Sequence, residues 1–352
     1  MEPADLDVCL DAGNFLQSRL WGRFKARFGW KALAFRCRRE DGASVPLLVL
    51  YRRLGAGFSF AYVPWGPEAS CAGGEPSAAL AALAAELRRQ LPPSTVFIRF
   101  DPPWYTTENS ASRIPPPFHR AASDVQPPDS VLVDLTAGEE TIRGRMKPKW
   151  RYNIGLAERN GVVVRCAGAS SPELPAALES YYRIYEETAE RDGIAIHGID
   201  YYRTLFELAA EPSPDSVQLR LYLASHEGED LAGVVTLFRR REAVYLYGAS
   251  RSHKRSLMAP YALQWRAMRD AKAALCEYYD LFGIPPHPPD RDPNHPMAGL
   301  YRFKTGFGGT IIHRPGSWDY GCRPFLKAAF FAAEGLRKKV WTLKKLLKRK
   351  KR

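Results

Sequence analysis

The feature of this sequence that most constrains its fold is an order of secondary-structure elements that occurs twice. Each copy has one or two helices, then three strands, a further helix and a last strand. We predict strands from β-branched and aromatic runs between Gly and Pro, and helices from longer segments with apolar residues about 3.6 apart. The first copy comprises residues 15–28, 31–36, 45–51, 58–63, 77–90 and 95–100, and the second comprises residues 172–191, 200–209, 218–224, 231–239, 243–247, 259–275 and 278–282.

This repeated order is the layout of acyl-CoA N-acyltransferase (GNAT-like) domains. We therefore expect a mixed α/β, or α+β, fold with two tandem GNAT-like domains, although such a fold does not by itself define a reaction. The 352 residues suit two domains of about 100–200 residues each. We place the first domain at 1–144, the second at 145–316, a C-terminal segment that packs back on the first domain at 317–335, and a basic amphipathic tail at 336–352.

Several classes of protein are disfavoured by simple features of the chain. No segment approaches the ~18 uninterrupted apolar residues of a membrane-spanning helix, and the first residues lack the basic start and apolar run of a secretory signal. The six cysteines lie far apart, without a C-x-x-C pair, and we expect reduced thiols in a cytoplasmic protein. His287, His295 and His313 lie in Pro/Gly-rich surroundings without acidic or Cys partners at ligand spacing, so we expect no metal site.

Five motifs follow one another between residues 15 and 320. They are Phe15-Leu16-Gln17-Ser18 with Trp21, Lys25 and Trp30; Tyr62-Val63-Pro64-Trp65-Gly66-Pro67; Lys149-Trp150-Arg151-Tyr152-Asn153-Ile154 with Ala157-Glu158-Arg159; Arg191-Asp192-Gly193-Ile194 with His197, Tyr201 and Leu246-Tyr247-Gly248-Ala249-Ser250; and Gly299-Leu300-Tyr301-Arg302-Phe303-Lys304-Thr305-Gly306-Phe307-Gly308-Gly309 with Trp318-Asp319. In this order they resemble the motifs of the FemABX family of peptidoglycan cross-bridge aminoacyltransferases.

The resemblance implies transfer of an amino acid from aminoacyl-tRNA to a side-chain amine of the peptidoglycan stem peptide. Its partners would be aminoacyl-tRNA and a lipid-linked or UDP-linked precursor, with no cofactor. Some family members carry a coiled-coil arm, but residues 191–218 are too short and lack sustained heptads. Two alternatives remain: an acetyl-CoA-dependent acetyltransferase, although no clear Gly-rich pyrophosphate loop is present, and a non-catalytic protein that binds RNA or membranes.

Lys304 is the first candidate for the catalytic group. The reaction needs a cation or donor where negative charge develops on the tetrahedral intermediate, but no protein nucleophile. The resemblance implies this role for the Phe303-Lys304 pair, and we expect the glycines at 306, 308 and 309 to let substrate approach the backbone. The alternative for Lys304 is a solvated side chain at a strand end.

Candidates for precursor binding come from both domains. The resemblance implies that Lys25 binds the precursor diphosphate, although one turn after Trp21 it could also lie on the wet face of an amphipathic helix. His197 and Tyr201 resemble a pair that contacts precursor phosphate. A relative has Arg in place of His197, and a neutral His binds phosphate less strongly than Arg.

Further candidates for substrate contact are Arg191, from the fourth motif, and Tyr247, which ends the central strand of the second domain. The alternative for Tyr247 is a half-buried aromatic of the sheet. Asp101 ends a predicted strand before two prolines, where it could orient the acceptor or take its proton. It could equally cap a turn.

Basic residues at two places could bind nucleic acid or lipid. Lys147, Lys149 and Arg151 alternate with other residues beside aromatic side chains and could bind tRNA, the alternative being a solvated helix start. Residues 336–352 contain ten Lys or Arg and no acid, with leucines and a valine at helical spacing. We expect them to form a helix on an anionic membrane surface, at the inner face of the cytoplasmic membrane. A disordered end or additional contact with tRNA is the alternative.

Overall fold

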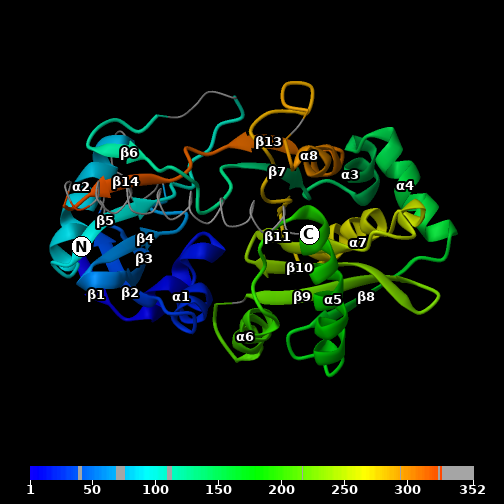
Figure 1. The fold of residues 1–352 in the computed structure, drawn as a ribbon, viewed down its shortest axis with the longest axis horizontal. Coiled ribbons are helices and arrows are strands. Elements are labelled where there is room, and N and C mark those ends of the chain that lie inside the picture. The colour runs from blue at the N-terminus through cyan, green and yellow to red at the C-terminus, as the bar shows by residue number, and fades with distance from the viewer. Residues whose placement is uncertain are drawn as a thin grey trace, which may run out of the picture.

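Two sheets lie side by side along the long axis of the molecule (Figure 1). The computed structural model describes residues 1–38, 42–68, 76–108, 113–215, 217–293, 295–323 and 326. Its α-helices are α1 (Arg19–Ala26), α2 (Pro76–Gln90), α3 (Glu139–Arg145), α4 (Pro148–Arg159), α5 (Leu174–Asp192), α6 (Ile199–Ala210), α7 (Ala259–Ala273) and α8 (Ala298–Thr305). The basic tail at 336–352, and most of 324–335, lie outside the described residues.

Each sheet has seven strands within the described residues. Those of the first are β1 (Glu2–Ala4), β2 (Lys31–Arg38), β3 (Ser44–Arg53), β4 (Ser59–Val63), β5 (Thr95–Phe100), β14 (Trp318–Gly321) and β6 (Phe118–Arg120), in spatial order. Those of the second are β8 (Val163–Gly168), β9 (Gln218–His226), β10 (Glu229–Arg239), β11 (Glu242–Ser250), β12 (Tyr278–Asp280), β7 (Asp129–Asp134) and β13 (Thr310–His313).

The two sheets have the same topology. In each, the fourth and fifth strands are parallel, β4 with β5 and β11 with β12, whereas the other neighbouring strands are antiparallel. A parallel pair needs a crossover connection, and α2 and α7 provide it. The predicted repeat is therefore confirmed, and the chain consists of two GNAT-like domains of mixed α/β structure.

The sixth strand of each sheet comes from a distant part of the chain. β14, near the C-terminus, lies between β5 and β6 in the first sheet, and β7 lies between β12 and β13 in the second. The hydrogen bonds of β7 thus place residues 129–134 in the second sheet, before the boundary predicted at residue 144. Sequence runs could not reveal this because the pairing of a strand depends on partners more than a hundred residues away.

One apolar core runs from the first domain into the second. α1 packs beside α6 (Figure 1), where the Phe24 and Tyr201 rings meet with centroids 4.6 Å apart. Buried Leu48 and Leu50 of β3 belong to the same cluster as Val235 and Leu237 of β10. The domains therefore share a water-excluding interface rather than a linker, and side chains from both can form one site.

A fully buried arginine also joins the domains. Arg239 of β10 donates hydrogen bonds to the Ala12 carbonyl at 2.5 Å and the Leu10 carbonyl at 3.1 Å, and it pairs with Asp215 at 3.2 Å. Asp215 also accepts from the Leu20 backbone N–H at 3.0 Å. Because both charges are buried, each depends on the other and on these hydrogen bonds for stability.

The predicted helix at 15–28 and the basic segment after residue 139 are each divided in the structure. Residues 15–28 form a 3₁₀ turn at Phe15–Gln17 and then α1, because Ser18 caps α1 and its hydroxyl accepts from the Trp21 N–H at 3.1 Å. The basic segment after residue 139 forms α3 and α4, since Pro148 starts a new helix and cannot donate to the previous one.

Candidate active site

A β-bulge in β11 sends two tyrosines to opposite faces of the second sheet. Val235 pairs with Tyr247 and the next residue, Thr236, pairs with Tyr245, so Leu246 is the extra residue. Tyr245 then packs with the core under α7 and α8, whereas Tyr247 packs with α5 and α6. Without the bulge, residues 245 and 247 would face the same side.

Lys304 lies on the same side of the second sheet as Tyr245. It lies on α8 and is 5% exposed, and its Nζ donates hydrogen bonds to the Phe282 carbonyl at 3.1 Å and the Gly283 carbonyl at 2.9 Å. The ammonium lies 4.9 Å from the centroid of the Tyr245 ring. Burial lowers the pKa of Lys304 to about 7, while the charge of Asp280 acts in the opposite direction. The side chain therefore exchanges between charged and neutral forms near neutral pH.

The surroundings of Lys304 correct two expectations. The alternative of a solvated lysine at a strand end is wrong, because the residue is helical and buried. A Cβ atom at Gly306 would lie 2.0 Å from the Trp150 indole, and one at Gly308 would lie 2.5 Å from the Arg145 carbonyl oxygen. These glycines thus make room for the packing of the chain itself, not for substrate.

Phe303 points into the apolar core. Its ring packs edge-on against Tyr261 and Phe307, with centroid distances of 5.2 Å to each, and its carbonyl accepts a hydrogen bond from the Trp150 indole at 2.9 Å. These contacts hold α8 against α4 and α7. Phe303 therefore positions the neighbouring Lys304, and its predicted catalytic role remains a prediction.

Four of the predicted binding residues meet at the domain interface. Lys25 Nζ lies 3.4 Å from the Tyr201 hydroxyl, and His197 stacks on Tyr201 with ring centroids 3.8 Å apart. Tyr247 lies edge-on to Tyr201 at 6.4 Å. The structure thus brings together residues from α1, α6 and β11 that are up to 222 positions apart in the sequence.

The electrostatics of this cluster favour a charged lysine beside a neutral histidine. Burial, and then the charge of Arg52, lowers the pKa of Lys25 to about 8. Burial and the charge of Lys25 lower the pKa of His197. Lys25 is half-buried, with its ammonium 5.2 Å from the Trp21 ring centroid, so the alternative of a residue on a wet helix face is wrong.

The polar groups of Arg191 and Asp101 form hydrogen bonds that connect separate segments of the protein. Arg191 donates to the Ser250 carbonyl at 2.7 Å, joining the end of α5 to the end of β11. Asp101 is 2% exposed and accepts from the Tyr62 hydroxyl at 2.5 Å, the Gln126 N–H at 3.2 Å and the Ser317 hydroxyl. Burial raises the pKa of Asp101 to about 6 against these hydrogen bonds. Asp101 therefore connects four segments, and its predicted part in the reaction stays a prediction.

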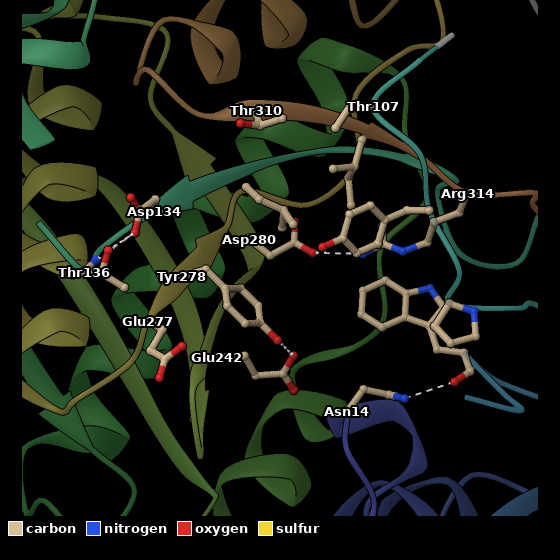
Figure 2. A pocket seen from close by; sticks show the side chains of 15 residues that line it. Asn14, Thr107, Asp134, Thr136, Glu242, Glu277, Tyr278, Asp280, Thr310 and Arg314 are labelled. Carbon is tan, nitrogen blue, oxygen red and sulfur yellow. Dashed lines mark hydrogen bonds and ion pairs between the residues drawn. The ribbon is translucent and has the colours of Figure 1, made fainter. Parts of the chain in front are cut away.

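A cavity of about 490 Å³ lies between the domains (Figure 2). Both domains contribute to its lining, the second through β7, β11, β12, β13 and the segments around these strands. The lining residues are Asn14, Trp65, Pro103, Tyr105, Thr107, Leu132, Asp134, Thr136, Glu242, Glu277, Tyr278, Asp280, Thr310, Ile312 and Arg314. Lys304 is not among them, but it bonds to the carbonyls of Phe282 and Gly283, just after Asp280. Lys304 and the cavity are therefore linked through the segment that follows β12.

Acidic residues dominate the polar lining of the cavity. Figure 2 shows the Tyr278 ring between Asp280 and Glu242, with its hydroxyl toward Glu242, to which it donates at 3.3 Å. Glu242 also accepts from the Phe15 N–H at 2.9 Å. Burial raises the pKa of Glu242 to about 7, and the charge of Arg239 opposes this. Such a wall can attract the ammonium form of an amine, which becomes the nucleophile of the expected aminoacyl transfer once it loses a proton.

The basic residues predicted to bind tRNA lie where α3 meets α4. Lys147 and Lys149 are exposed, and Lys147 lies 5.8 Å from the Trp150 ring centroid. Arg151 instead donates to the Gly144 carbonyl at 3.0 Å and the Met146 carbonyl at 2.5 Å, so it fixes the turn between the helices. The two lysines remain free to contact a polyanion, and that contact stays a prediction.

Three residues around the cavity escaped the sequence analysis: Glu242, Asp280 and Arg314. Asp280 ends β12, the fifth strand of the second sheet, and Asp101 follows β5, the fifth strand of the first. The internal repeat could therefore have indicated Asp280 as the counterpart of Asp101. Glu242 and Arg314 gave no such signal, because each is defined by contacts with the other domain or with a distant strand. Among the described residues, no three His, Cys, Asp or Glu side chains are placed to hold a metal ion.

A comparison with protein-family models decides the family. The model of the FemAB family matches residues 117–212 and 218–334, which is more than half of the chain. The chain belongs to the FemAB family. The predicted resemblance to this family is thus confirmed, although the motifs at 15–30 and 62–67 lie outside the matched residues.

Individual relatives agree with this membership. A UDP-N-acetylmuramoylpentapeptide-lysine N(6)-alanyltransferase from Weissella viridescens is 28% identical over 185 residues, which span 52% of this FemAB protein and 50% of the relative. The match therefore covers about half the length of each.

In the part of the chain that is described, no helix combines the length and apolar content needed to cross a membrane.

Solved structures show the same fold. The crystal structure of FemX has a TM-score of 0.74 at 17% identity, covering 94% of this FemAB protein and 99% of FemX. The L-PGS from Bacillus licheniformis has a TM-score of 0.51 at 14% identity, covering 91% and 92% of the two chains. At these identities the likeness concerns the fold alone.

Proposed function

We propose that this protein transfers an amino acid from aminoacyl-tRNA to the side-chain amine of a peptidoglycan stem peptide, at the cytoplasmic face of the membrane. Membership of the FemAB family supports the proposal. So does the activity named for the relative from Weissella viridescens, which is alanyl transfer to the lysine of UDP-N-acetylmuramoyl pentapeptide.

The observation that carries the proposal is the buried ammonium of Lys304. As a charged group it has three N–H bonds, and two donate to the Phe282 and Gly283 carbonyls. Within the described residues no third oxygen or nitrogen acceptor contacts it, and the Tyr245 ring lies 4.9 Å from the ammonium. We propose that the remaining N–H donates to a substrate oxygen. A cation held rigidly in a site of low dielectric stabilises developing negative charge more than a solvated one.

In the proposed reaction the neutral amine attacks the carbonyl carbon of the aminoacyl ester. A C–N bond forms, and negative charge develops on the carbonyl oxygen, where Lys304 donates its free N–H. The intermediate then collapses: the bond from carbon to the ribose oxygen breaks, and the proton lost by the amine ends on that oxygen. The products are the extended stem peptide and uncharged tRNA, so neither oxidant nor cofactor is required.

Precursor and tRNA would occupy different parts of the surface. Lys25, beside Tyr201 and His197, supplies positive charge for the precursor phosphates. The exposed Lys147 and Lys149 would contact the tRNA backbone. The acidic wall of the cavity, with Asp280 and Glu242, would receive the acceptor amine.

The test is transfer by the Lys304→Met variant. We expect it to fold normally but to slow transfer about 10²–10³-fold, the usual cost of losing one oxyanion donor. Arg302→Met is the matched control, because Arg302 is an exposed cation on the same helix. Near-normal turnover of Lys304→Met, with chemistry limiting the rate, would remove Lys304 from the mechanism.

A further inference from the structure

Arg314 lines the cavity, and two of its guanidinium nitrogens have no hydrogen-bond partner among the described residues. Its side chain is 8% exposed, and its guanidinium carbon lies 4.2 Å from the centroid of the Trp65 ring. Nη2 lies 3.4 Å from an Asp280 carboxylate oxygen. Figure 2 marks this contact with a dashed line. Nε and Nη1 are buried without a hydrogen-bond acceptor among the described residues. This arrangement costs free energy unless another molecule supplies the acceptor.

The position of Arg314 is fixed by its neighbours. Trp65 supports one face of the guanidinium, and Asp280 holds Nη2. Asp280 is itself held, since it accepts hydrogen bonds from the Phe282 N–H at 2.7 Å and from the Ser130 hydroxyl. A buried donor that is held in this way is suited to bind an oxygen of a ligand without losing side-chain freedom.

The charges around Arg314 indicate which anion it takes. It is the one basic side chain among the described residues that line the cavity. Four acids line the same space: Asp280 and Glu242, and Asp134 and Glu277, which pair with Arg145 and Arg241 outside it. A dianionic phosphate would meet repulsion from these groups. A carboxylate carries one charge, and an ammonium group near it would be attracted by Asp280 and Glu242.

We propose, resting on the function proposed above, that Arg314 binds a carboxylate of the acceptor peptide and so selects acceptors that carry this group near the reactive amine. Two sources have this chemistry. One is a second carboxylate on the amine-bearing residue, as in a diamino dicarboxylic acid, and the other is the C-terminal carboxylate of the stem peptide.

The test measures the Kd of UDP-linked stem peptides by titration calorimetry without a donor. Four peptides are compared: one with lysine at the acceptor position, one with diaminopimelate, one with diaminopimelate whose carboxyl beside the reactive amine is amidated, and one with lysine and a C-terminal amide. We expect Arg314→Gln to weaken binding of the peptides that retain the recognised carboxylate by about 10- to 100-fold. Peptides without it should bind both proteins equally, which also shows that the variant is folded.

The pattern identifies the source of the carboxylate. If wild type prefers diaminopimelate to its amide and Arg314→Gln loses that preference, the side-chain carboxylate is recognised. If the C-terminal amide instead abolishes the difference between the proteins, the C-terminus is recognised. Arg314→Lys should recover part of the affinity, and Arg323→Gln, an exposed cation outside the cavity, should bind as wild type does.

Equal loss of affinity for all four peptides, or none for any, would overturn the proposal. The second result would follow if water alone satisfies Nε and Nη1. Because binding is measured without transfer, either result leaves the proposed reaction standing. Conversely, carboxylate-dependent binding without transfer would support Arg314 and contradict the reaction.

Discussion

Lys25 of the first domain and Tyr201 of the second meet at the domain interface, with 3.4 Å between Nζ and the hydroxyl oxygen. The aromatic rings of Trp21, Phe24 and Tyr201 lie within 5.2 to 5.8 Å of the ammonium. These contacts lower the cost of a half-buried charge. They hold Lys25 where a substrate bridging both domains would meet it.

We expect Lys25→Ala to raise the KM for the precursor about tenfold or more and to change kcat only a few-fold. The reason is that a contact with the precursor phosphates stabilises ground state and transition state alike. Steady-state kinetics with the precursor varied checks this. Arg27→Ala, which removes an exposed cation just after the same helix, is the control. An unchanged KM in Lys25→Ala would exclude the phosphate contact.

The pKa of about 7 for Lys304 leads to a pH dependence. Because this pKa is lowered, the fraction of charged Lys304 falls as pH rises through 7, while the fraction of neutral acceptor amine rises until about pH 10. We expect log kcat/KM to rise below pH 7 and to level off above it. In Lys304→Met the break near pH 7 should disappear, so that the rise continues. A break that persists in the variant would assign it to another group.

The buried Arg239 gives a prediction about stability. Arg239→Met leaves Asp215 charged and buried without its cation, and we expect the free energy of unfolding to fall by about 3–5 kcal/mol. Urea unfolding measures this. Asp215→Asn in the same protein should restore part of the loss. The control is Arg240→Met, because Arg240 is 44% exposed and should matter by less than about 1 kcal/mol. Equal stabilities of the two single variants would contradict the account.

The sequence allowed the repeat of elements to be predicted because strand and helix patterns are local. It did not reveal which strands β7 and β14 pair with, since nothing within residues 129–134 or 318–321 specifies a partner strand. Lys25, His197, Tyr201 and Tyr247 could be named from motifs, and the structure places them together. Arg314 could not, because its importance lies in Trp65 and Asp280, which meet it only in the folded protein.

The basic tail at 336–352 provides a prediction from sequence alone, as it lies outside the described residues. Each basic residue near an anionic leaflet contributes about 1 kcal/mol. We expect removal of residues 337–352 to abolish sedimentation with anionic vesicles and to spare transfer to a UDP-linked precursor. Neutral vesicles are the control. If the truncated chain sediments as the full chain does, the tail is not the membrane anchor.

The central claim is that aminoacyl-tRNA is the donor for a stem-peptide amine. The most direct measurement incubates the full chain with charged tRNAs, each in turn, and UDP-linked or lipid-linked precursor, and follows the mass of the precursor. We expect its mass to increase by one amino-acid residue with at least one charged tRNA, and ribonuclease treatment of the donor to abolish the increase. Acetyl-CoA should be inert. An acetylated precursor formed without tRNA would contradict the account.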